Sequence, residues 1–277
     1  MKRIAKRLVI VLLLIGMAAV GLAMWGGPLA DIRPAVITLE PQPDREARGR
    51  ALIEAALVAQ GEGDGLAGYK TRSFRMEDEW RGAAAALFSP WPDPIVEARV
   101  VQRRHSFDST VTFVSGKRAG DTWGVVDAYA WERSGSGKAT PTDNPGLTFM
   151  LPTLHYFVEF ALRFPEAEII RYVGSESIRG VEYQVVFLTW GSTNASERYD
   201  QYLVYVDPKT SRIAKVYYTV RDAMKFITGA GHLLEQKPVG GIWMATRIPV
   251  TQKPTDDPAE FIHEFRFSDI VFDADEL

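Results

Sequence analysis

The second half of the chain is dominated by segments in which apolar and polar residues alternate, with short turns between them. In residues 212–221, one face carries the apolar side chains of Ala214, Val216, Tyr218 and Val220. This period of two is that of a β-strand. The preceding turn, Asp207–Thr210, contains a proline that presets the bend of a hairpin to residues 199–206. Because strands joined by short turns pair antiparallel, the sequence predicts a mostly β domain with an antiparallel sheet.

Other segments rich in β-branched and aromatic residues predict the remaining strands. They are residues 66–80, 96–104, 110–115, 122–132, 181–187, 225–235, 242–251 and 261–272. Helices are predicted at two places, Ala47–Gln60 and residues 150–163. The second helix is followed by Pro165, and its apolar face consists of Leu154, Phe157, Val158, Ala161 and Leu162. We expect this helix to cover one face of the sheet.

The N-terminus has the pattern of an export signal or a membrane anchor. Four basic residues (Lys2, Arg3, Lys6 and Arg7) precede an uncharged stretch from Leu8 to Leu29. Cleavage after the small residues around Gly21–Ala23 would release the rest of the chain, whereas the length of the stretch and Trp25 favour an uncleaved anchor. We therefore expect a signal peptide or anchor over residues 1–25, a linker rich in Gly and Pro over 26–44, and a single domain over 45–277.

Charge and cysteine content exclude several classes of protein. The net charge is −3, and it becomes −7 when the four N-terminal basic residues are left out. An acidic domain is not expected to bind nucleic acid. The absence of cysteine excludes disulfides, thiol nucleophiles, cysteine zinc sites and a lipidated N-terminal cysteine.

Motifs of catalysis are missing from the sequence. The four histidines have no HExxH or HxH spacing, and no serine lies in a GxSxG elbow. We expect no catalytic residues, no metal and no cofactor. The alternative of an unrecognised enzyme would use Asp200, Arg221 or Asp222, although these residues are more typical of strand ends and turns.

Aromatic residues are the most prominent remaining signal, because many of them fall on predicted strands. Tyr217 and Tyr218 are neighbours, so their side chains must point to opposite faces of the sheet. A sheet that is apolar on both faces must be covered twice or must offer one face to a ligand. We expect a groove for an apolar ligand under the 150–163 helix, lined by Leu203, Tyr205, Val216, Tyr218, Val220, Phe157 and Phe160. A one-residue shift in strand register would exchange the faces.

Two segments resemble a known family. The run YDQYLVYVDPKT at residues 199–210, with Ile213 and residues 216–222 after it, is similar to the periplasmic lipoprotein carriers and lipoprotein-localisation proteins of the LolA/LolB-like superfamily. The later run GGIWMATRIP at residues 240–249 resembles the glycine-led strand of that family. The resemblance covers roughly residues 165–272.

The resemblance implies an open, curved antiparallel half-barrel whose hollow is covered by one or more helices. It also implies binding of an acyl chain or a protein partner, without catalysis. The expected function is binding of a lipid, acyl chain or other apolar ligand in the cell envelope, linked to the handling of lipids or lipoproteins. The alternative is a membrane-tethered sensor or adaptor that binds an envelope protein. The expected location is the periplasmic side of the inner membrane, or the periplasm if the N-terminal segment is cleaved.

Overall fold

The computed structural model describes residues 28–61, 68–222 and 225–273, and these contain one antiparallel sheet of 14 strands. The predicted N-terminal signal or anchor lies outside the described residues. The strands are β1 (Thr71–Trp80), β2 (Ile95–Arg103), β3 (Ser109–Phe113), β4 (Thr122–Val126), β5 (Tyr129–Arg133), β6 (Thr140–Pro141), β7 (Ile169–Ile178), β8 (Val181–Thr189), β9 (Tyr202–Val206), β10 (Ile213–Thr219), β11 (Thr228–His232), β12 (Leu234–Val239), β13 (Ile242–Thr251) and β14 (His263–Phe272). The helices are α2 (Pro43–Ala59), α3 (Ala83–Leu87) and α4 (Pro145–Arg163), followed by a short 3₁₀ turn at Phe164–Glu166.

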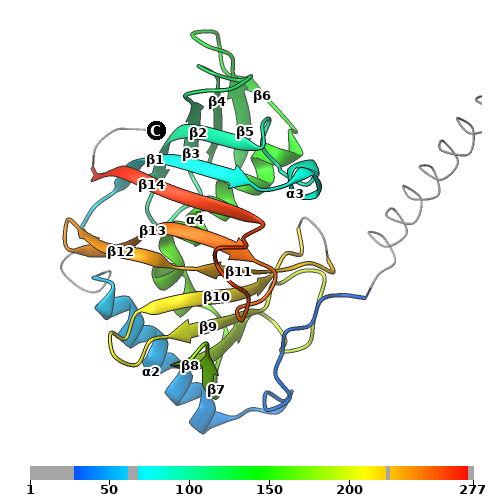
Figure 1. Cartoon of the computed structure of the whole chain (residues 1–277), viewed down its shortest axis with the longest axis vertical. Helices are drawn as coiled ribbons and strands as arrows, with labels where there is room; N and C mark the ends of the chain where they lie inside the picture. Colours follow the sequence, from blue (N-terminus) through cyan, green and yellow to red (C-terminus); the bar gives the residue numbers. More distant parts are fainter. Residues whose placement is uncertain (1–27, 62–67, 223–224, 274–277) are drawn as a thin grey trace, which may run out of the picture.

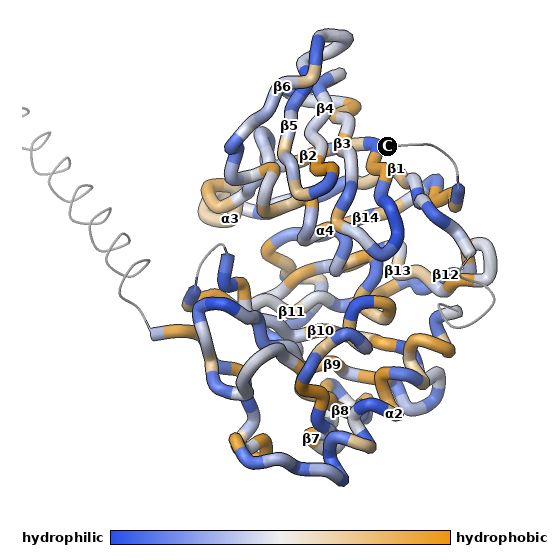
Figure 2. Tube along the Cα trace, turned by 180° about the vertical axis from the view of Figure 1, so that it is seen from behind, coloured by the Kyte–Doolittle hydropathy of each residue, from blue (hydrophilic) through white to orange (hydrophobic). Residues whose placement is uncertain are grey.

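The sheet is open and curved. Its strand order is β6-β5-β4-β3-β2-β1-β14-β13-β11-β10-β9-β8-β7, with β12 paired to β13 outside this path. The outer strands β6 and β7 are not paired with each other, so the sheet does not close into a barrel. Figure 1 shows the sheet curving around α4, which lies behind it in that view, and Figure 2 shows the molecule from the opposite side. The predicted fold of an open antiparallel half-barrel covered by helices is therefore confirmed for the described residues.

The apolar residues of the strands and of α4 meet in one large core. Alternate residues of each strand point inward, such as Phe74 and Met76 on β1 and Phe265 and Phe267 on β14. On the other face of these two strands, Arg75 and Arg266 are charged and exposed, whereas Glu264 is charged and buried. Because the strands alternate in this way, the sheet has an apolar concave face and a largely polar convex face.

Helix α4 is longer than the sequence predicts and is buried on more than one side. It begins at Pro145, because the Asn144 side chain caps it by accepting hydrogen bonds from the backbone N–H groups of Gly146 (3.0 Å) and Leu147 (3.4 Å). Pro152 lies inside the helix instead of near its start, and the backbone leaves helical geometry at Glu159 (φ −124°, ψ 23°). The helix is thus interrupted in its second half.

Helix α2 covers the sheet edge formed by β7. The Arg45 guanidinium donates to the backbone oxygens of Tyr172 (2.9 Å) and Val173 (3.1 Å), and Arg50 donates to that of Glu168 (3.0 Å). These bonds satisfy carbonyl groups that an edge strand would otherwise leave open for another chain. At the other edge, β6 has only two residues, the second of which is a proline.

A second apolar cluster lies on the convex face, over β8, β9 and β10. Residues 28–42, predicted as a linker, run along this face with the side chains of Ile32 and Ile37 buried. The backbone N–H of Ile32 donates to the side-chain oxygen of Gln201 (3.0 Å), and Thr193 donates to the backbone oxygen of Thr38 (3.4 Å). In this structure the segment packs on the domain along much of its length.

Several strand boundaries differ from the prediction. The single strand expected at 122–132 is the hairpin β4–β5, whose turn residues Asp127 and Ala128 both have positive φ (50° and 65°). A two-residue turn of this kind suits a hairpin, but Asp-Ala is not its usual sequence. Strand β7 was not among the predicted strands, since its second half is polar and a bulge interrupts it between Tyr172 and Gly174.

Candidate functional site

The concave face of the sheet is the candidate site, and α4 fills it in this structure. Phe157 of α4 packs against Phe265 of β14, with ring centroids 4.8 Å apart, and against Tyr218 of β10 at 5.8 Å. It also approaches Gly231 of β11, where an added Cβ atom would meet the Phe157 ring at 3.4 Å. Since 3.4 Å is an ordinary van der Waals distance, the ring packs on this part of the sheet without requiring a glycine.

Aromatic side chains line one rim of this filled hollow. The ring of Tyr202 on β9 lies 6.1 Å from those of Tyr156 on α4 and Trp190 after β8, and 6.5 Å from that of Tyr218. Tyr156, Trp190 and Tyr218 are each partly exposed. Burial raises the pKa of the Tyr202 and Tyr218 hydroxyls above the ordinary value, so both stay neutral. The rim is thus an apolar surface whose tyrosine hydroxyl groups are uncharged. Helix α4 covers this surface incompletely.

A buried charged cluster joins the second half of α4 to β1. Glu159 accepts hydrogen bonds from Arg72 of β1 and from Nε of Arg163 (2.9 Å). The exposed fractions of the Arg72 and Glu159 side chains are 1% and 0%. Although burial alone would raise it, the pKa of Glu159 is lowered to about 2, chiefly because of Arg72 and His155. Burial lowers the pKa of His155, whose Nδ1 lies 3.5 Å from Glu159.

Some donors of this cluster lack an acceptor. Nε and Nη1 of Arg72 and Nε2 of Gln102, which lies opposite Arg72 on β2, are buried without a hydrogen-bond partner. At neutral pH this cluster carries one net positive charge, because its two arginines are cationic, Glu159 is anionic and His155 is neutral. Buried donors without acceptors cost about 1–3 kcal/mol each, so this end of the hollow favours an acceptor or an anion.

A second buried acid sits at the end of β1. Asp78 accepts hydrogen bonds from the indole N–H groups of Trp80 (3.0 Å) and Trp91 (2.7 Å). Its other oxygen lies 3.0 Å from Nδ1 of His263 on β14, whose ring stacks on Trp80 at 4.4 Å. Because its oxygens are engaged by three side chains, Asp78 ties the end of β1 to the start of β14.

The predicted groove residues fall into two groups. Phe157, Phe160, Val216 and Tyr218 pack in the concave core, and Val220 lies one residue beyond the end of β10. Leu203 and Tyr205 pack instead in the convex cluster with Ile37. The register explains the split, because Leu203 pairs with Tyr217, on the face opposite to Tyr218. Four of the seven residues are therefore brought together, and the inward-facing residues of β9 are Tyr202, Val204 and Val206.

The prediction from sequence missed the buried charged cluster. Glu159 and Arg163 are four residues apart within the otherwise apolar α4, so their side chains lie on one side of the helix. A charged pair at this spacing in a helix with such a broad apolar surface indicates a buried ion pair. Its partner Arg72 could not be found in this way, since it is distant in sequence.

The residues of the alternative enzyme hypothesis hold together the end of the β9–β10 hairpin. Asp200 accepts hydrogen bonds from the hydroxyl of Thr219 (2.8 Å) and the backbone N–H of Arg221 (2.9 Å). Burial raises the pKa of Asp200, and Asp222 is exposed. Among the described residues, no three His, Asp or Glu side chains are placed to hold a metal ion.

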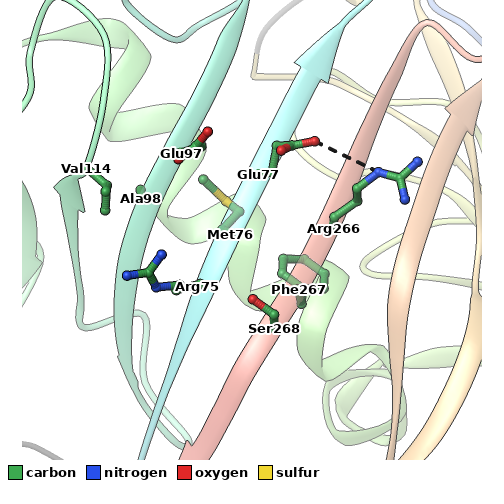
Figure 3. A pocket seen from close by; sticks show the side chains of 9 residues that line it. All are labelled: Arg75, Met76, Glu77, Glu97, Ala98, Val114, Arg266, Phe267 and Ser268. Atoms are coloured by element: carbon green, nitrogen blue, oxygen red, sulfur yellow. Dashed lines mark ion pairs between the residues drawn. The ribbon is translucent and has the colours of Figure 1, made fainter.

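The convex face carries a shallow depression of about 220 Å³ over β1, β2 and β14. Figure 3 shows its lining, in which Glu77 and Arg266 form an ion pair of 3.9 Å. Arg75, Glu97 and Arg266 are exposed there. None of the predicted ligand-binding residues lines it, and its charged lining does not suit an apolar ligand.

Comparison with known proteins gives no match to a family model and none to a curated protein. Solved structures of the same fold exist. A DUF1329 family protein from Desulfovibrio piger matches with a TM-score of 0.50 and 12% identity over 83% of this chain and 95% of that one. A LolA superfamily protein from Nitrosomonas europaea matches with a TM-score of 0.50 and 12% identity over 80% and 92%. A putative outer membrane lipoprotein-sorting protein domain from Vibrio parahaemolyticus has a TM-score of 0.49 and 11% identity over 84% and 95%.

The two matches with a TM-score of 0.50, at 12% identity, show the fold alone and no activity. The open sheet curved around α4 is the fold of the LolA superfamily protein and of the DUF1329 protein. The resemblance to the LolA/LolB-like superfamily that the sequence indicates is thus confirmed at the level of the fold.

Proposed function

We propose that this protein binds an acyl chain or another apolar ligand, without catalysis, between the concave face of its sheet and helix α4. The concave face supports this function because apolar side chains cover it from β4 to β8, where α4 packs together with Ile53 and Ala56 of α2. Transfer of a ligand into such a surface is favourable by about 0.8 kcal/mol for each buried CH₂ group. A long acyl chain therefore needs no reactive group to bind.

The ligand enters as α4 gives up part of its contact with the sheet. The helix is suited to this movement, since Pro152 removes one backbone hydrogen bond and the helix is interrupted at Glu159. The aromatic rim of Tyr156, Trp190 and Tyr218 forms the entrance, because these side chains are already partly exposed. An apolar chain that enters there replaces contacts between α4 and the sheet by contacts of its own.

The two ends of the strand order, β6 and β7, disfavour an adaptor that adds a partner strand at either of them. The Arg45 and Arg50 side chains occupy backbone carbonyls along β7, and β6 is too short to template another strand. The location proposed for this activity is the cell envelope, with residues 1–25 serving as anchor or as signal peptide.

A fluorescent fatty acid titrated against two matched variants tests this function. Tyr218→Glu places a charge on the concave face, whereas Tyr217→Glu places the same charge next to it on the convex face. We expect the first variant to lose binding at least tenfold and the second to bind like the unmodified protein. Circular dichroism verifies that both variants are folded. Absence of binding to the unmodified protein, or equal loss in both variants, would contradict the proposal.

A further inference from the structure

One end of the sheet gathers several loops together with the start of the described chain. The register places the end of β1 beside the start of β14, through Trp80 and His263, and the end of β10 beside the start of β11, through Thr219 and Thr228. The loops of residues 81–94, 190–201 and 252–262 therefore emerge at this end, which we call the junction end. Figure 1 shows α3 at this end of the sheet, on the same side as the chain entering from the N-terminus.

The N-terminal part of the described chain is fixed at the junction end by hydrogen bonds. The backbone N–H of Ala30 donates to the backbone oxygen of Lys225 (2.9 Å), and Arg221 donates to the backbone oxygen of Ala30. Ala30 is the fifth residue after Trp25, which ends the most apolar part of the N-terminal stretch. Five residues span at most about 18 Å, so whatever holds residues 8–25 is close to the junction end.

The loop of residues 81–94 presents apolar side chains to solvent at this end. Helix α3 and the residue after it read Ala-Ala-Ala-Ala-Leu-Phe, and the exposed fractions of Leu87 and Phe88 are 83% and 50%. Ile262, in the loop between β13 and β14, is 37% exposed, and its backbone oxygen accepts a hydrogen bond from Arg81 (2.9 Å). Leu87 and Ile262 therefore belong to two neighbouring loops of the same end.

The charges beside this apolar tip are paired. Lys117 lies 3.0 Å from Asp93, and Arg81 lies 3.5 Å from Glu79. The exposed apolar residues Leu87, Phe88 and Ile262 are therefore accompanied by little net charge. Their contact with a membrane surface would depend on burial of apolar area more than on attraction to anionic lipids.

We propose that the junction end lies on the membrane surface and that Leu87 and Phe88 insert into the head-group layer of the bilayer that holds residues 8–25. The chain itself indicates that the partner of this surface is a lipid bilayer. Its uncharged N-terminal stretch, which has bilayer-spanning length, joins the domain at the end where Leu87 and Phe88 are exposed. The inference rests on the proposed location and on an uncleaved N-terminus, and it deepens both. In this orientation the junction end of the sheet faces the membrane and the opposite end points away from it.

The absence of cysteine makes a direct test possible in the full-length protein. Leu87→Cys and Ile262→Cys at the junction end, and Tyr129→Cys at the opposite end, are each labelled with an environment-sensitive fluorophore. Tyr129 is a fitting control because it is 79% exposed and is the first residue of β5, directly after the turn that follows β4, at the opposite end of the sheet. The labelled proteins are incorporated into phosphatidylcholine–phosphatidylglycerol vesicles with and without a doxyl-labelled lipid that quenches the fluorophore.

We expect blue-shifted emission and several times stronger quenching at positions 87 and 262 than at 129. The double variant Leu87→Glu/Phe88→Glu should reduce quenching at 262 while the protein still floats with the vesicles. Equal quenching at 87 and 129, or failure of the full-length protein to float with vesicles, would overturn the proposal. Binding of the fluorescent fatty acid is measured on the same samples, so loss of ligand binding is recorded separately from loss of membrane contact.

Discussion

Arg72 of β1 and Glu159 of α4 form an ion pair inside the apolar core, and neither side chain reaches solvent by more than 1% of its surface. This pair links the helix that fills the hollow to the wall of the hollow. Arg163 shares the carboxylate from one turn further along the helix, at 2.8 Å. The position of α4 is therefore set by charge as well as by apolar packing.

Removal of the charge on Glu159 should destabilise the protein strongly. Glu159→Gln leaves Arg72 and Arg163 buried without their counter-ion, which typically costs about 3–5 kcal/mol. The free energy of unfolding in urea measures the effect, and a double-mutant cycle with Arg72→Met isolates the pair. Strictly additive effects of the two substitutions would mean that the two side chains do not interact. Asp257→Asn, which breaks the exposed pair with Arg179, is the matched control and should have a much smaller effect.

Acidification between pH 6.5 and pH 4 should lower stability through buried histidines. Burial, and to a lesser extent Lys215, lower the pKa of His232 to about 4, and burial also lowers the pKa of His155. In this window the unfolded chain takes up protons that the folded protein does not bind. The free energy of unfolding therefore falls as the pH falls, by up to about 1.4 kcal/mol per pH unit for each histidine.

Urea unfolding from pH 8 to pH 5 measures this slope. His232→Gln should make the curve flatter, because it removes one of the groups that titrate. Glu159 does not contribute in this range, since its lowered pKa causes a loss of stability only as the pH falls below about 4.5 towards 2. A slope unchanged in the His232→Gln variant would contradict this assignment.

The segment before α2 should contribute to stability through its buried isoleucine. Ile37 is 2% exposed within the convex cluster, whereas Leu39, two residues later, is 59% exposed. Ile37→Ala should cost about 2–5 kcal/mol, the usual range for such a truncation in a core, and Leu39→Ala should cost far less. Thermal unfolding followed by circular dichroism compares the two variants. Equal behaviour would indicate that residues 28–42 leave the domain in solution.

Gly49→Ala should destabilise the protein although alanine favours helices. A Cβ atom at position 49 of α2 would lie 2.9 Å from the backbone nitrogen of Tyr172 on β7. Because the obstacle is backbone, the helix must move away from the sheet edge that it caps. In an exposed helix the same substitution stabilises by about 0.5–1 kcal/mol. An increase in melting temperature would show that the contact between α2 and β7 is looser than the structure has it.

The hairpin of β9 and β10 could be predicted because its turn sequence and its alternation agree. Which face of β9 points inward could not be read in the same way, since all five residues of Tyr202–Val206 are apolar and buried. A bulge between Ile213 and Lys215 also shifts the pairing of β10 with β9. Leu203 and Tyr205 consequently exchange faces with Tyr202 and Val204 relative to the prediction.

The segment 28–42 shows another limit of sequence patterns. Its prolines, Pro28, Pro34 and Pro41, are typical of a linker, and Ile32 and Ile37 are too far apart to form a periodic apolar face. Their burial depends on a cluster on β8, β9 and β10 that only the folded sheet assembles. The membrane anchor was predicted from residues that lie outside the described part of the chain, and within that part no helix is both long and apolar enough to cross a membrane.

Native mass spectrometry of the protein purified from cell envelopes without detergent tests binding to the concave face most directly. Our account predicts a population heavier than the apoprotein by the mass of an acylated molecule, which disappears in the Tyr218→Glu variant and persists in Tyr217→Glu. An apoprotein mass alone in repeated preparations, together with no uptake of added fatty acid, would contradict it.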